Sequence, residues 1–198
     1  MELWEFLSNN VDFIIAIFTT LFAVVGMQFK DMRVIIASQM VANGLLAAQC
    51  IIGGTLSAGG AVMVGTVQTA ISFILASKKI KFPIWLTALF VCAYTAVTVI
   101  CFSSPFDIAT GVAGWFFAVA MVQERSSVCR VCSLANLSLW LVYDFCVMPS
   151  GAIPHVIIFV CTVVSVIRLD RGDWKRAFNR IFGKESTKTE ENSEKEIV

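Results

Sequence analysis

Charged side chains are scarce in this sequence, and apolar ones are correspondingly abundant. Asp, Glu, Lys and Arg make up 15% of the 198 residues, whereas apolar residues make up 58%. An ordinary soluble domain is about one quarter charged and about one half apolar. A water-soluble core cannot bury this much apolar surface in a chain of this length. The composition therefore argues against a soluble globular protein and predicts an integral membrane protein.

The short motifs of common enzymes are also missing, and the chain contains a single histidine. It has no HExxH, GxSxG or Walker sequence and no aspartate-rich metal motif. A catalytic site needs a nucleophile or base held by partner groups, and none can be assembled from one histidine and its neighbours in the sequence. We therefore expect a protein that is not an enzyme and that needs no metal or cofactor. No nucleic-acid partner is expected.

What the chain does contain is a series of long apolar runs. A helix needs about 20 apolar residues to cross the hydrocarbon layer. Unsatisfied backbone groups exclude irregular chain from lipid, and the runs are too long and too continuously apolar for the strands of a barrel. The predicted fold class is all-α integral membrane, with seven transmembrane helices. They are predicted at residues 11–29, 34–52, 57–77, 83–102, 106–122, 128–147 and 151–168.

Positive charges fall on alternate connections between these helices. Lys30 and Arg33 follow the first helix, three lysines within residues 78–81 follow the third, and Arg125 and Arg130 follow the fifth. The remaining eight Lys and Arg residues follow the seventh helix, and the opposite connections have none. Basic residues collect on the cytoplasmic side of a membrane. We therefore expect the N-terminus outside and the C-terminus in the cytoplasm, because six spans would place basic clusters on both faces.

The two halves of the chain contain a candidate internal repeat. Residues 42–75 can be laid over residues 135–168 at an offset of 93, which matches Asn43 with Asn136. Chance similarity between apolar segments is the alternative explanation. Topology favours the repeat, because one extra helix between two sets of three makes the sets parallel, related by an axis along the membrane normal.

The predicted architecture is thus 3+1+3, two parallel three-helix bundles joined by a linker helix. After the last span, aromatic and apolar residues at helical spacing alternate with basic ones, which is typical of an interfacial helix. The final residues lack apolar content and are expected to be disordered. The predicted domains are a first bundle at 1–77, a linker helix at 78–104, a second bundle at 105–170, and a cytoplasmic amphipathic helix with a disordered tail at 171–198.

Two stretches carry a resemblance to a known family. They are GGTLSAGGAVMVGTVQTAISFIL at residues 53–75 and the segment at residues 135–171, which begins ANLSLWLVYDF. Over most of its length the chain resembles the YgjV family of bacterial inner-membrane proteins. The resemblance implies a multi-pass protein of the bacterial inner (cytoplasmic) membrane.

A more distant resemblance concerns the 3+1+3 layout and the run WLVY at residues 140–143. Both are similar to the SWEET and PQ-loop (MtN3-like) transporter group, whose members hold a substrate near the midplane of the membrane. Members place a Trp of the middle helix and an Asn of the third helix around that substrate. The resemblance implies such a role for Trp140, and the Asn position falls near His155 or Val156.

Polar side chains within the predicted spans are the candidate functional residues. Such groups are costly in a bilayer and usually face the bundle interior or a cavity. Hydrogen bonding between helices is the alternative for the amides and hydroxyls, packing for the tryptophan, and a structural hydrogen bond for the histidine. The candidates for substrate binding are Asn43, Gln68, Thr69, Asn136, Trp140, Tyr143, His155 and Thr162.

Two functions remain open from the sequence. The first is a small facilitative transporter that moves a neutral or dipolar solute by alternating access between the two bundles. Facilitated movement fits better than proton-coupled pumping, because no Asp, Glu, Lys or Arg lies at the middle of a span, where proton-coupled carriers need an ionisable group. The second is a membrane scaffold of the same shape that binds a partner and moves nothing. The expected partners are the lipid bilayer, a small-molecule solute and, as one option, further copies of the chain.

Overall fold

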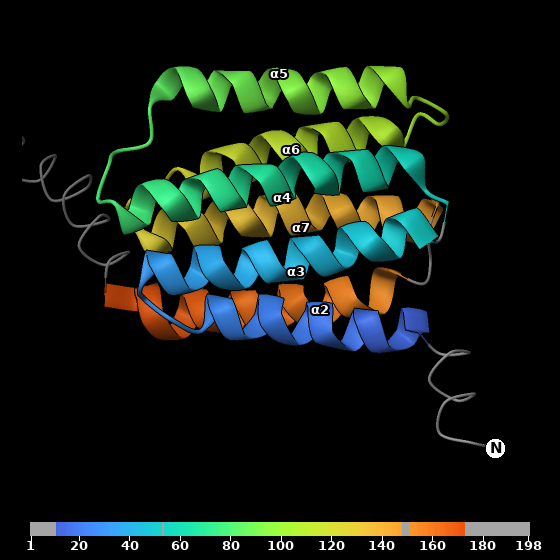
Figure 1. Ribbon diagram of the computed structural model, residues 1–198. Helices are drawn as coiled ribbons and strands as arrows, with labels where there is room; N and C mark the ends of the chain where they lie inside the picture. Colours follow the sequence, from blue (N-terminus) through green and yellow to red (C-terminus); the bar gives the residue numbers. More distant parts are fainter. Residues whose placement is uncertain (1–10, 53, 148–150, 173–198) are drawn as a thin grey trace, which may run out of the picture.

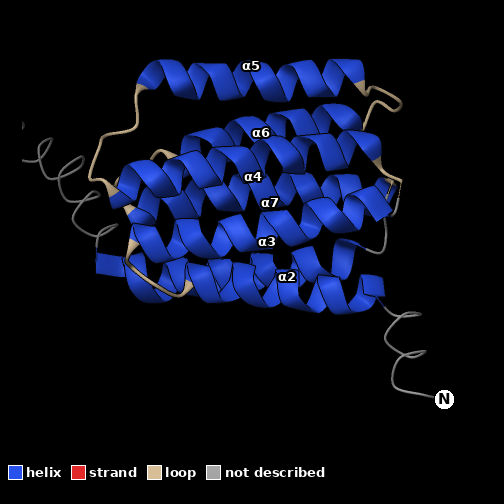
Figure 2. Ribbon diagram, viewed as in Figure 1, coloured by secondary structure: helices blue, strands red, loops and turns tan. Residues whose placement is uncertain are grey.

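The computed structural model describes residues 11–52, 54–147 and 151–172, and these residues form helices joined by short turns (Figures 1 and 2). No strand occurs within those ranges. Short turns and continuous apolar runs favour neighbouring antiparallel helices, as in other helical bundles. The helices are α2 (Val11–Met27), α3 (Met32–Ile52), α4 (Leu56–Ser77), α5 (Ile84–Ile100), α6 (Asp107–Met121), α7 (Ser126–Cys146) and an unlabelled last helix, Gly151–Gly172.

The seven predicted helices match the seven in the described part of the chain within a few residues at each end. Four of them, α3, α4, α7 and the last helix, are long and apolar enough to cross a membrane. The other three are apolar but have at most 17 residues each. The all-helical, multi-pass character of the chain is confirmed. The predicted interfacial helix and tail beyond residue 172 lie outside the described residues.

Consecutive helices run in opposite directions, so their connections gather at two ends of the bundle (Figure 1). At one end α2, α4, α6 and the last helix finish. Every described Lys and Arg lies in the connections at this end or within about one helical turn of it. We call this the basic end. The other end, where α3, α5 and α7 finish, carries Asp107 and Asp144 and no described Lys or Arg. We call it the acidic end.

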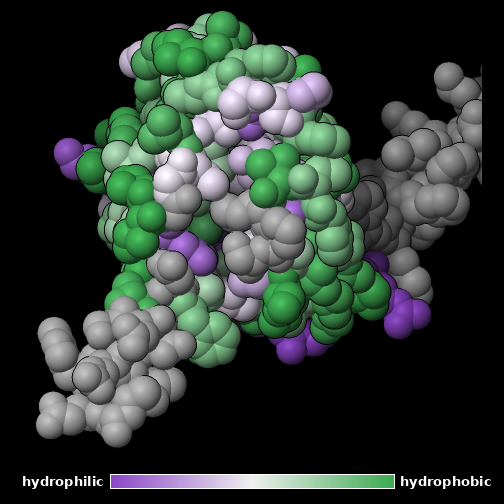
Figure 3. Space-filling model, turned by 90° about the vertical axis from the view of Figure 1, so that its right-hand side faces the viewer, coloured by the Kyte–Doolittle hydropathy of each residue, from purple (hydrophilic) through white to green (hydrophobic). Residues whose placement is uncertain are grey.

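The flanks of the bundle are apolar. Large apolar side chains such as Ile84, Ile100 and Ile153 are exposed on them. Figure 3, which looks onto the acidic end, shows apolar residues along most of the visible rim. A water-soluble protein rarely exposes a continuous apolar surface of this extent. The flanks are therefore suited to contact lipid.

Close helix contacts in the bundle depend on small residues. A Cβ atom placed on Gly114 of α6 would lie 2.3 Å from the Tyr94 ring of α5, and one placed on Gly111 would lie 2.5 Å from Thr98 Oγ1. Side chains larger than hydrogen at these two positions would push α5 away from α6. Small residues that let helix backbones approach are typical of helix packing in membranes. This packing brings Tyr94 to the interior, where it forms a core cluster with Phe90 and residues of α4 and α6.

Candidate functional site

A cavity of about 70 Å³ lies inside the bundle. Its wall includes residues from all seven described helices. A space of this size holds several water molecules, since one water needs roughly 10 to 15 Å³ on the same scale. The cavity is therefore large enough for a small solute and is the natural candidate for a functional site.

Four of the eight candidate residues line this cavity, namely Asn43 of α3, Asn136 and Trp140 of α7, and His155 of the last helix. Asn136 Nδ2 donates a hydrogen bond to the carbonyl oxygen of Ala113 at 2.8 Å. The indole of Trp140 stacks on the imidazole of His155, with 5.6 Å between ring centroids. The fold thus brings together four residues that are up to 112 positions apart in the sequence.

The other four candidates do not contribute to the cavity wall. Thr69 Oγ1 and Thr162 Oγ1 donate to carbonyl groups of their own helices, at 2.9 and 2.7 Å. Gln68 Nε2 donates to the carbonyl oxygen of Ala118 at 3.1 Å and so ties α4 to α6. These three bonds correspond to the structural alternative that the sequence left open. A role in substrate binding stays a prediction for all eight residues.

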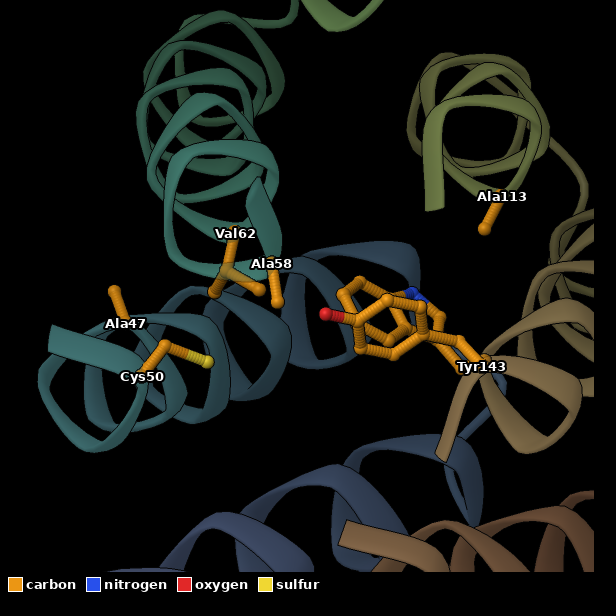
Figure 4. Close-up of a cluster of buried hydrophobic side chains, with 7 residues drawn as sticks. Ala47, Cys50, Ala58, Val62, Ala113 and Tyr143 are labelled. Atoms are coloured by element: carbon orange, nitrogen blue, oxygen red, sulfur yellow. The ribbon is translucent and has the colours of Figure 1, made fainter. Parts of the chain in front are cut away.

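Tyr143, the last of these four, packs beside the cavity instead. It belongs to a buried cluster that also contains Trp140. Its ring meets that of Trp140 edge to face, with centroids 5.8 Å apart. In Figure 4 the Tyr143 hydroxyl points toward Ala58 of α4. Tyr143 therefore supports the position of Trp140 from behind the cavity wall.

Three buried polar atoms of the cavity wall have no hydrogen-bond partner within the described chain. They are Thr19 Oγ1 of α2, Asn43 Nδ2 of α3 and Ser133 Oγ of α7. A buried donor or acceptor without a partner costs about 1 to 3 kcal/mol. Three such atoms around one cavity suit it to a polar occupant. Thr19 and Ser133 were not among the residues predicted from the sequence, because hydroxyls inside a helix are usually bonded to their own backbone.

The acidic end of the cavity is bordered by a buried acid–base pair. His155 Nδ1 is hydrogen-bonded to Asp144 Oδ2, which joins α7 to the last helix. Asp144 is 0% exposed and His155 6% exposed. From the sequence, a structural hydrogen bond was left open for His155, but its partner was not identified. The packing of the last helix against α7 places the two side chains in contact.

The basic end contains a network around Arg130, which is also fully buried. Its Nη1 atom contacts Asp170 Oδ1 of the last helix at 2.7 Å. Its Nε atom donates to the carbonyl oxygen of Met27 at 3.1 Å, and Nη2 donates to that of Phe29. One guanidinium thus holds the end of α2, the start of α7 and the end of the last helix together.

Asp107 is the third buried acidic group and lies at the first residue of α6. Its Oδ1 accepts a hydrogen bond from Ser57 Oγ of α4 at 2.7 Å. Its Oδ2 accepts from the backbone N–H groups of Ser103 and Ser104, both at 2.8 Å, and from Ser103 Oγ at 3.1 Å. Four donors therefore satisfy this carboxylate, which fixes the α5–α6 turn against α4.

An apolar helical bundle with a polar interior and charged groups at its two ends defines a multi-pass membrane protein. The sequence profile of the Imp-YgjV family, described as "Bacterial inner membrane protein", matches residues 11–173. The chain therefore belongs to this family of bacterial inner-membrane proteins, as the sequence resemblance predicted. No curated protein sequence and no solved structure matches the chain.

Proposed function

We propose that this protein is a small facilitative transporter that carries a neutral or dipolar small solute through the bacterial inner membrane. The observation that carries the proposal is the central cavity, whose wall combines unpartnered polar atoms with the face of Trp140. A scaffold that only binds a partner has no need for such a space, because unpartnered buried groups reduce its stability. The cavity volume of about 70 Å³ favours a solute of a few non-hydrogen atoms.

The proposed topology has seven spans, with the N-terminus outside and the C-terminus in the cytoplasm. It is supported by the collection of every described Lys and Arg at the basic end, which would then face the cytoplasm. A reporter fused after Val198 should be active only as a cytoplasmic marker. Activity of a periplasmic reporter at the same position would reject this orientation.

The proposed architecture is 3+1+3, in which α2 to α4 form one bundle, α5 is the linker, and α6, α7 and the last helix form the other. Support comes from Asn43 and Asn136, which occupy matched positions of the candidate repeat and both line the cavity. Alternating access between two such bundles requires that each end can close. The contacts around Arg130 and those between Asp144 and His155 are suited to close the basic and acidic ends, respectively.

The test is solute movement in vesicles that contain the purified protein. Urea, glycerol, acetamide and glycine serve as probes, because they are small and neutral or dipolar. Vesicles with protein should take up at least one probe faster than vesicles without it, and Trp140→Phe should slow this uptake. Trp85→Phe is the matched control, because Trp85 is exposed on the flank of α5. Equal uptake with and without protein for every probe would favour the alternative hypothesis, a membrane scaffold that moves no solute.

A further inference from the structure

The two buried carboxylates at the acidic end differ in how their charge is balanced. Asp107 accepts hydrogen bonds from four donors, so its negative charge is stabilised by the α5–α6 turn and Ser57. The carboxylate of Asp144 meets only His155, and its Oδ1 atom is buried without a partner in the described chain. Charge balance at Asp144 therefore depends on whether the Asp144–His155 pair holds a proton.

The position of His155 gives this pair a route to water. Its Nδ1 atom faces Asp144, which places Nε2 on the opposite side of the ring. The residue also lines the central cavity, whereas Asp144 does not. A proton in the cavity can therefore reach the pair through His155. On its other side the imidazole stacks on the indole of Trp140, with ring centroids 5.6 Å apart.

We propose that Asp144 and His155 form a proton-binding site, and that loss of its proton opens the acidic end of the cavity. The link to solute movement rests on the proposed transport function, whereas proton binding by the pair does not. With one proton, the pair is a neutral unit, either carboxylate with imidazolium or carboxylic acid with neutral imidazole. When Nε2 gives that proton to water in the cavity, a net negative charge remains on Asp144.

A net negative charge is unfavourable in a closed, apolar site and becomes tolerable when water reaches it. Proton loss therefore favours separation of α7 from the last helix at the acidic end. Proton binding favours the closed arrangement, in which the two helices are held by the neutral pair. This coupling differs from the sequence-based expectation, in which the absence of an ionisable group at mid-span argued for facilitated movement without protons.

The surrounding elements contribute few groups that could replace this pair. Tyr143 of α7 and Cys50 of α3 belong to the adjacent buried cluster, and both are neutral in their ordinary protonated forms. Helix α6 contributes Asp107, whose charge is stabilised by its four donors. Ser57 of α4 carries only a neutral hydroxyl. Arg130 and Asp170 lie at the opposite end of α7 and the last helix.

The first experiment measures proton binding directly. His155 is the only histidine in the sequence, so nitrogen NMR of histidine-labelled protein without a histidine tag reports this residue alone. In either form of the protonated pair Nε2 carries a proton, so this atom should change from protonated to unprotonated in one step as the pH is raised. An Nε2 atom whose protonation stays the same over the whole pH range in which the protein is folded would overturn the proposal.

The second experiment measures uptake of the same four probes at different pH values, equal on both sides of the vesicle. In the wild-type protein, uptake should fall as the pH is lowered, by up to about tenfold per pH unit, the limit for one proton. Asp144→Asn cannot carry the negative charge, so its uptake should stay low and independent of pH. Glu124→Gln is the control, because this carboxylate is exposed, and it should respond to pH as the wild type does.

The outcomes separate the two proposals. Wild-type uptake that does not change with pH, or an Asp144→Asn variant that keeps the wild-type response, would overturn the proton site while transport stands. A wild-type protein that moves no probe, with a normal one-step NMR titration, would overturn transport and keep the proton site. The uptake measured for the Asp144→Asn protein is interpreted only if its helical content and size-exclusion profile match those of the wild type.

Discussion

The two ends of α7 are joined to the last helix by different kinds of buried ion pair. At the basic end Arg130 pairs with Asp170 and also donates to two carbonyl groups at the end of α2. At the acidic end Asp144 has His155 as its only partner among the described residues. A guanidinium keeps its charge at all ordinary pH values, whereas an imidazole gains or loses a proton near neutral pH. The pair at the basic end therefore keeps its charges at all ordinary pH values, whereas we propose that the pair at the acidic end responds to pH.

This difference shows how buried charge can serve either stability or function. Removing one member of a buried ion pair leaves the other uncompensated, which costs more than the intact pair contributes. Arg130 satisfies several groups at once, so its loss affects three helices. His155 contacts one oxygen of one carboxylate, so its loss affects a single contact between two helices. The predictions below test this comparison, in order of the expected change in stability.

The largest effect is expected for Arg130→Met. The variant leaves Asp170 and the carbonyl groups of Met27 and Phe29 without their buried donor. We expect the free energy of unfolding to fall by about 3 to 5 kcal/mol, measured by denaturation in detergent. Arg33→Met is the matched control, because Arg33 is exposed at the same end and should be close to wild type. Equal stability of the two variants would contradict a stabilising role of the Arg130 network at the basic end.

The next largest effect is expected for Asp107→Ala at the acidic end. Its four donors would lose their acceptor, and the α5–α6 turn would lose its contact with Ser57. We expect a loss of about 2 to 4 kcal/mol of unfolding free energy. Asp144→Asn keeps a polar group beside His155 and should cost less. If Asp144→Asn were the more damaging change, the two carboxylates would not have the different roles that we assign to them.

A third prediction concerns the part of the bundle that small residues hold together, where no buried charge is involved. Gly114→Ala would bring a methyl group within 2.3 Å of the Tyr94 ring, so α5 must shift. We expect a loss of about 1 to 3 kcal/mol, as for other overpacked sites. Gly44→Ala is the control, because a methyl group there meets nothing within 4 Å. Thermal unfolding that ranks the two variants equally would argue against close packing of α5 on α6.

The helices themselves were predictable from the sequence because a span needs a continuous apolar run, which is a local property. The predicted span at 128–147 lies within two residues of α7 at both ends. The ion pairs were not predictable in the same way. Arg130 and Asp170 are 40 positions apart, and only the packing of the last helix against α7 brings them together. From the sequence alone, each is a charged residue near the end of a predicted span, where water can solvate it.

The candidate site was predictable in part for a similar reason. Asn136 and Trp140 are four residues apart on one helix, so their placement on one face follows from helical geometry. Both line the cavity. Thr69 and Thr162 are also polar residues inside spans, but their hydroxyls bond to their own backbone, an alternative that sequence cannot distinguish. The contact of His155 with Asp144 could not be predicted, because it depends on how the last helix packs against α7.

The most direct test of the account compares Asn43→Leu with Thr66→Val in both stability and solute uptake. Leucine has nearly the shape of asparagine and removes a buried amide that has no partner for Nδ2. Stability should therefore rise by about 1 kcal/mol, while uptake of the transported probe should fall toward that of vesicles without protein. Thr66→Val removes a hydroxyl bonded within its own helix, away from the cavity, and should leave uptake unchanged. Normal uptake by a stable Asn43→Leu protein would contradict the claim that a polar solute passes through this cavity.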